Sequence, residues 1–136
     1  MSEASEEPVR PIVLIADDDA DIRSLLRAHL ETRPCTLLEA RNGEEALETI
    51  IVEQPDLVLL DVMMPVVNGW QICQYVREKD GLDHVGILML TAIGSKVNEM
   101  TSPLYGADAY LDKPFDLDDL DAAIRAVLTK RLGSEA

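Results

Sequence analysis

Polar side chains able to bind a metal ion or a phosphoryl group stand at the ends of apolar segments of the sequence. Asp17 and Asp18 follow residues 11–16 directly, and Asp61 ends the apolar segment 57–61. Carboxylates held ~4 Å apart repel each other by roughly 4 kcal/mol at an effective dielectric constant of about 20, so such a cluster requires a cation. Magnesium prefers oxygen ligands and binds one or two carboxylates together with substrate phosphate. These residue types predict magnesium-assisted chemistry on phosphate, provided that the fold brings the carboxylates together.

Two further residues fit the same chemistry. Thr91 ends the apolar run 85–91, and Lys113 ends the shorter run 109–113. A hydroxyl can donate a hydrogen bond to a phosphoryl oxygen, and an ammonium group supplies three donors and a positive charge. Each residue is ordinary when taken alone. Thr91 and Lys113 support the prediction because each lies at the end of a predicted strand, as the aspartates do.

The segments that carry these residues alternate between strand and helix patterns. Continuous apolar runs predict strands buried on both faces, and apolar residues spaced about 3.6 apart predict helices. The predicted strands are 11–16, 35–40, 57–61, 85–91 and 109–113. The predicted helices are 20–32, 44–54, 69–79 and 115–132, together with a short or broken helix before residue 109, where Pro103 removes a hydrogen bond. Asp19 and Asn68 are expected to cap helices.

Strand and helix alternation of this kind predicts one α/β domain, a doubly wound five-stranded parallel sheet with helices on both faces. Ligands of such sheets bind at the carboxyl ends of the strands. The polar residues named above therefore converge on one edge.

Composition restricts the classes of partner. The chain has 136 residues, 47% of them hydrophobic, which suffices for one domain with a buried core. A net charge of -14 disfavours direct contact with nucleic acid or anionic lipid. No apolar run approaches the ~18 residues of a membrane span and no signal peptide is present, so a cytoplasmic protein is expected. Cys35 and Cys73 lack metal-site spacing, which indicates reduced, half-buried thiols. His29 and His84 are expected near the surface, without a predicted partner.

Four motifs resemble those of the receiver domains of two-component response regulators, over about residues 10–130. They are "IADDD", "LLDVMMPVVNG", "LTA" and "DKPF". The resemblance implies a chemotaxis-type receiver with a flavodoxin-like fold and strand order 2-1-3-4-5. The receiver domain is then expected to span 10–132, between a disordered acidic leader at 1–9 and a short tail at 133–136.

The resemblance also implies a role for each site residue. Asp61 would accept the phosphoryl group. Asp18 would bind magnesium, or manganese in its place, directly, and Asp17 mainly through water. Asp61 and the backbone carbonyl of Met63 would complete the metal ligands.

Further roles implied by the resemblance concern the phosphoryl group and the response to it. Thr91 would hydrogen-bond the phosphoryl group, and Lys113 would pair with it or, before reaction, with Asp61. Tyr110 occupies the position of an aromatic switch that turns inward when Thr91 moves. Lys113 and Pro114 resemble the family's cis peptide.

The function implied is that of a phosphoacceptor that catalyses only its own phosphorylation and dephosphorylation. A histidine kinase or histidine phosphotransfer protein would be the donor. An unknown downstream protein or effector domain would be contacted through the face around strand five, without direct nucleic-acid or membrane binding. Met63 and Ile93, at the variable positions that influence hydrolysis, are apolar and cannot orient water, so we expect slow autodephosphorylation. Pro103 is expected to shorten or break a helix that contributes to the face commonly used by the family for dimerisation and output, so the usual dimer mode is not assumed.

Other functions remain open at this point. A magnesium-dependent phosphatase with an aspartyl nucleophile is the chief alternative, although such enzymes place a second acid where this chain has Met63. A nucleotide- or flavin-binding module is less favoured because neither G-x-G-x-x-G nor G-x-x-x-x-G-K-[ST] occurs. The sequence does not decide between a stand-alone receiver and part of a longer regulator.

Overall fold

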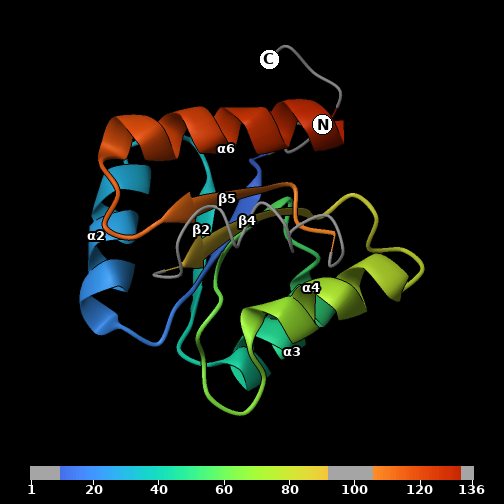
Figure 1. The fold of residues 1–136 in the computed structure, drawn as a ribbon. Coiled ribbons are helices and arrows are strands. Elements are labelled where there is room, and N and C mark those ends of the chain that lie inside the picture. The colour runs from blue at the N-terminus through green and yellow to red at the C-terminus, as the bar shows by residue number, and fades with distance from the viewer. Residues whose placement is uncertain (1–9, 92–105, 133–136) are drawn as a thin grey trace, which may run out of the picture.

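The computed structural model describes residues 10–91 and 106–132, which form a three-layered α/β domain (Figure 1). One five-stranded sheet has the order β2-β1-β3-β4-β5, and all neighbouring strands run parallel. The strands are β1 (Ile12–Ala16), β2 (Thr36–Ala40), β3 (Leu57–Asp61), β4 (Gly86–Thr91) and β5 (Ala109–Asp112). The helices of the described part are α2 (Ala20–Leu30), α3 (Gly43–Glu53), α4 (Gly69–Glu78) and α6 (Leu117–Leu132). The predicted fold class and strand order are confirmed.

Helices cover both faces of the sheet, with α2 and α6 on one face and α3 and α4 on the other (Figure 1). Each face has its own core. Alternate residues of the central strands, such as Leu14 and Leu60, pack with Ile50 and Ile72 beneath α3 and α4. The intervening residues pack with Leu26 and Val127 beneath α2 and α6. Because both sets are apolar, the central strands are continuous hydrophobic runs.

Local signals set the helix boundaries. Asp19 caps α2 by accepting the N–H of Asp21 at 2.9 Å, and Asn68 forms a reciprocal capping box with Gln71 at the start of α4. Both predicted caps are confirmed. The helix predicted from residue 115 begins two residues later, because the Asp116 carboxylate accepts the N–H of Asp119 and acts as the cap.

A buried ion cluster joins the amino-terminal ends of β4 and β5 to the last turns of two helices. Asp108, whose side chain is fully buried, accepts a 2.8 Å bond from Arg77 of α4 and a 2.7 Å bond from Arg131 of α6. Its other contacts include the backbone N–H of Ile87 at 2.9 Å. Buried carboxylates require partners of this kind, and the cluster fixes both helices against the sheet.

Several predictions lie outside the described residues or need correction. The leader, the tail, Ile93 and the helix around Pro103 are outside them. Cys73 is fully buried rather than half-buried, because α4 turns it into the core. His29 does have a partner, since its Nε2 lies 2.9 Å from Asp121 Oδ1 of α6.

No helix within residues 10–91 and 106–132 has the length and hydrophobicity that a membrane span requires.

Candidate functional site

The predicted site residues meet at the carboxyl edge of the sheet. Asp17 follows β1, Asp61 and Thr91 are the last residues of β3 and β4, and Lys113 follows β5. One carboxylate oxygen from each of Asp17, Asp18 and Asp61 lies within 4.8 Å of the others. Asp17 and Asp61 are buried, whereas Asp18 is exposed. The strand ends thus hold a cluster of three carboxylates, of which one, Asp18, is exposed.

Lys113 reaches across this edge to two carboxylates. Its Nζ lies 2.8 Å from Asp17 Oδ2 and 3.4 Å from Asp61 Oδ1. Burial opposes the charged ammonium, but the hydrogen bond and the charge of Asp17, together with Asp61, outweigh it and raise the pKa of Lys113. The expected pairing with Asp61 is therefore secondary, because Asp17 is closer and takes the stronger bond.

Asp61 occupies an unfavourable environment for a carboxylate. Burial and, next, the negative charge of Asp17 raise the pKa of Asp61 to about 6, and Lys113 only partly offsets them. The Asp61 side chain also accepts a long, 3.3 Å hydrogen bond from the backbone N–H of Met63. A carboxylate held in this way is stabilised by an added cation. Perturbed acids of this kind cluster at functional sites.

Asp17 is held through its backbone and side chain together. Its carboxylate accepts the N–H of Asp19 at 2.9 Å in addition to the bond from Lys113. Its backbone N–H donates to Ala40 at the end of β2, and its carbonyl accepts a 2.8 Å bond from the Arg23 guanidinium. The position of Asp17 is thus set by α2, β2 and the residue after β5.

Close backbone approach positions the loop that follows Asp61. A Cβ on Gly69 would lie 2.6 Å from the Asp61 carbonyl oxygen, and a Cβ on Gly43 would lie 1.9 Å from the carbonyl oxygen of Val67. Only glycine fits at either position, so α3 and α4 both press on this loop. Met63 in the loop exposes 62% of its surface, which leaves an apolar side chain facing solvent beside Asp61.

The remaining predicted residues lie on β4, on β5 and directly after it. Thr91 is fully buried, and its carbonyl accepts the N–H of Lys113 at 2.7 Å. Tyr110 is half-buried and packs against the core beneath α3 and α4. The peptide between Lys113 and Pro114 is cis.

The donor set fits a hard divalent cation. Three carboxylates supply oxygen ligands only, with no nitrogen or sulfur among them, and their exposed member leaves the site open to water. This chemistry suits magnesium, which retains several waters.

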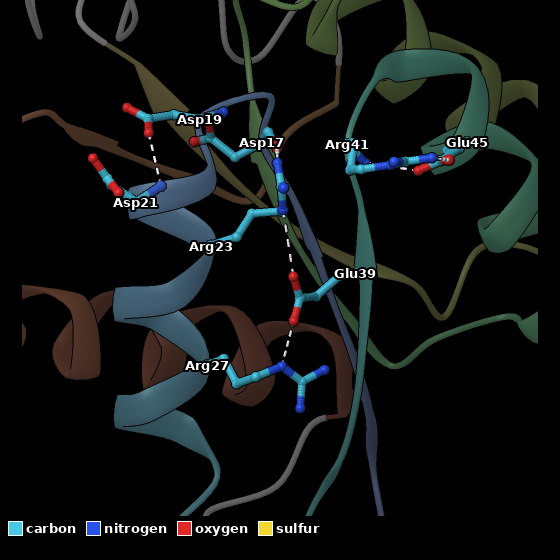
Figure 2. A network of polar contacts seen from close by, with 8 residues as sticks. All are labelled: Asp17, Asp19, Asp21, Arg23, Arg27, Glu39, Arg41 and Glu45. Carbon is cyan, nitrogen blue, oxygen red and sulfur yellow. Dashed lines mark hydrogen bonds and ion pairs between the residues drawn. The ribbon is translucent and has the colours of Figure 1, made fainter.

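Sequence reasoning missed the arginines and the glutamate that support the site. Figure 2 shows Arg23 lying between Asp17 and Glu39, and Arg27 reaching the same glutamate. Arg23 lies six residues after Asp17, a spacing that permits the contact but does not require it. The partner Glu39 comes from β2, which sequence spacing alone does not relate to α2.

Comparison with known proteins identifies the fold and the family. The sequence matches the response regulator receiver domain over residues 13–125. The probable transcriptional regulator ycf27 of Guillardia theta is 43% identical over 118 residues, which cover 87% of this chain and 45% of the relative. The DNA-binding dual master transcriptional regulator RpaA of Synechocystis is 37% identical, over 88% of this chain and 50% of the relative. The chain spans about half the length of these relatives.

Solved structures that are similar to this one are also response regulators. A putative response regulator from Chloroflexus aurantiacus is 32% identical with a TM-score of 0.82, covering 89% of this chain and 99% of that one. The chemotaxis protein CheY4 of Vibrio cholerae is 30% identical with a TM-score of 0.80, covering 88% and 100% respectively. The sequence match over residues 13–125, together with the acidic edge, Lys113 and the strand order, shows that the chain belongs to the response regulator receiver domain family of two-component signalling.

Proposed function

We propose that this receiver accepts a phosphoryl group on Asp61 in a magnesium-dependent reaction and signals through protein contacts. The observation that carries the proposal is the buried Asp61 carboxylate, which lies beside Asp17 and Lys113 and has a pKa raised to about 6. At neutral pH this group is mostly ionised and therefore nucleophilic. Because burial and Asp17 disfavour the negative charge of Asp61, a cation bound beside it would stabilise the carboxylate.

The reaction follows from the positions of these groups. A carboxylate oxygen of Asp61 attacks phosphorus, the bond from phosphorus to a phosphohistidine nitrogen breaks, and the product is an acyl phosphate. Lys113, already 3.4 Å from Asp61, neutralises charge on the phosphoryl oxygens. Asp17, Asp18 and Asp61 would hold magnesium, with the Met63 carbonyl as a further ligand, and magnesium when bound supplies charge neutralisation at the phosphoryl group.

The same site offers a route from phosphorylation to output. The Thr91 hydroxyl would donate to the phosphoryl group, and Tyr110, already half-buried over the core, would move further inward. If Tyr110→Ala leaves phosphorylation-dependent partner binding unchanged, the signal does not pass through this ring. A histidine kinase or phosphotransfer protein would be the donor, and the regulators that it resembles support an output in transcription.

The lifetime of the acyl phosphate depends on whether a side chain can orient water beside Asp61. Met63 is exposed there and apolar, so hydrolysis by water should be slow. Met63→Asn should change the lifetime measured after removal of the donor. Equal lifetimes in both proteins would remove this residue from the explanation.

The function is tested by intact mass after incubation with magnesium and acetyl phosphate, or with a phosphohistidine donor. The wild type should gain one phosphoryl mass that is lost with hydroxylamine and prevented by chelator, whereas Asp61→Asn should gain none. Asp56→Asn is a matched control, because Asp56 bonds the N–H of Ile12 away from the site. No adduct with either donor would refute the proposal. Sustained hydrolysis of small phosphoesters would instead support the phosphatase alternative.

A further inference from the structure

Arg23 contacts the loop of Asp17 and Asp18 through the loop backbone, whereas Lys113 contacts the Asp17 carboxylate. The residue lies in α2, and its side chain turns back so that Nη1 donates to the Asp17 carbonyl at 2.8 Å. Its side chain is only 14% exposed. That carbonyl belongs to the peptide joining Asp17 to Asp18, so its orientation directs both carboxylates.

The guanidinium is itself held in place by β2. Its Nε lies 3.4 Å from Glu39 Oε1, and the other carboxylate oxygen of Glu39 is bound by Arg27 one helical turn further on (Figure 2). Glu39 thus keeps the Arg23 side chain against the backbone carbonyl. A planar guanidinium with a fixed fork of donors suits this bridging position better than an ammonium would.

Glu39 also compensates the positive charge that Arg23 brings close to the proposed cation site. A positive charge beside Asp17 and Asp18 competes with a bound cation, and an unrestrained arginine can move onto the carboxylates as an internal counter-ion. Pairing with Glu39 compensates the charge and holds the guanidinium on the carbonyl side of the loop. The pair therefore orients the loop without placing the Arg23 charge on the carboxylates.

We propose that Arg23 is a positioning residue for the divalent cation site, acting on the Asp17 carbonyl and held in place by Glu39. The inference rests on the proposed function, because it assumes that Asp17, Asp18 and Asp61 bind magnesium. The direction of the effect separates this role from a purely electrostatic one. Removing a positive charge near a cation site strengthens cation binding if charge alone matters, and weakens it if orientation dominates.

The test is Mg²⁺ affinity by isothermal titration calorimetry on wild type, Arg23→Gln, Glu39→Gln and Arg27→Gln. Arg23→Gln should weaken Mg²⁺ binding by about tenfold, the lower end of the loss seen when residues supporting metal ligands are replaced. Glu39→Gln should also weaken it, because Arg23 is released toward the carboxylates. Arg27→Gln is the matched control: it removes a positive charge and a Glu39 contact on the same helix but touches no part of the loop, so affinity should be retained or slightly raised.

A second readout separates positioning from a loss of folding. Arg23→Gln should raise the Mg²⁺ concentration needed for half-maximal phosphorylation by acetyl phosphate, while the rate at saturating Mg²⁺ stays near that of wild type. Unchanged or tighter Mg²⁺ binding by Arg23→Gln overturns the inference and leaves the proposed function standing. Wild-type Mg²⁺ binding without an adduct on Asp61 overturns the proposed function alone, and no Mg²⁺ binding by wild type overturns both.

Discussion

Replacing Asp61, the proposed phosphoacceptor, by its neutral isostere asparagine should make the folded protein more stable at neutral pH. Burial and Asp17 raise the pKa of Asp61 from an ordinary value of 3.8 to about 6. At about 1.4 kcal/mol per pKa unit, this difference corresponds to about 3 kcal/mol of folding free energy. Asn at this position has the same shape and no charge, so Asp61→Asn should recover most of that amount.

The pH dependence identifies the cause. Because the folded protein binds the Asp61 proton more tightly than the unfolded chain does, the contribution of this group to stability is fully present below about pH 3.8 and is lost as pH rises through about 6. The gain from Asp61→Asn should therefore be about 3 kcal/mol at pH 7 and fall toward zero near pH 4. Added Mg²⁺ should narrow the gap at pH 7, since the wild type offers it three carboxylates and the variant only two.

Urea denaturation of both proteins from pH 4 to pH 7.5, without metal, measures this directly. Asp56→Asn is the control, because the Asp56 carboxylate accepts the backbone N–H of Ile12 at 2.8 Å and its loss should not stabilise the fold. Equal stability of wild type and Asp61→Asn at pH 7 would refute the electrostatic account of the site. A gain that stayed constant with pH would assign the effect to packing.

Three further predictions concern Val66, the ion cluster of Asp108, and Lys113. Val66→Asn should raise the free energy of unfolding by about 1 kcal/mol and the melting temperature by about 3 °C. Val66 has a φ of 71° and is 87% exposed, and asparagine tolerates this backbone conformation better than valine does. An unchanged melting temperature would show that Val66 is not strained. Asp108→Ala should lower the free energy of unfolding by about 3 to 5 kcal/mol, because it leaves two partly buried arginines without their carboxylate. Lys130→Ala is the control: Lys130 is exposed, and its loss should change the free energy of unfolding, measured in urea, by less than about 1 kcal/mol. Lys113→Met should slow phosphorylation by acetyl phosphate by about 100-fold, because one group that neutralises charge in the transition state is lost. An unchanged rate would show that Lys113 takes no part in the reaction.

The fold was predictable because its elements depend on local pattern. Continuous apolar runs such as 57–61 specify strands covered on both faces, and the caps at Asp19 and Asn68 require only neighbours within three residues. Helix ends were less certain. The last helix begins at Leu117 rather than at residue 115, because the choice of cap depends on how the chain leaves β5.

The candidate site was predictable in its membership but not in its pairings. Parallel strands bring their carboxyl ends to one edge whatever the details of packing, so Asp17, Asp61 and Lys113 had to lie along the same edge. Which carboxylate Lys113 prefers depends on separations of 2.8 and 3.4 Å, which no spacing in the sequence encodes.

By itself the sequence determined the α/β architecture, the acidic edge and the family, since periodicity and motif are written along the chain. Only the tertiary structure decided that Arg23 holds the Asp17 carbonyl, that Glu39 from β2 holds Arg23, and that Asp108 gathers the ends of α4 and α6. The physical reason is that each of these contacts depends on how a helix packs against the sheet, which no spacing along the chain encodes. A hydrogen bond tolerates a variation of only a few tenths of an ångström around a donor–acceptor distance of about 2.9 Å, so the partners are selected only once the helices have packed against the sheet.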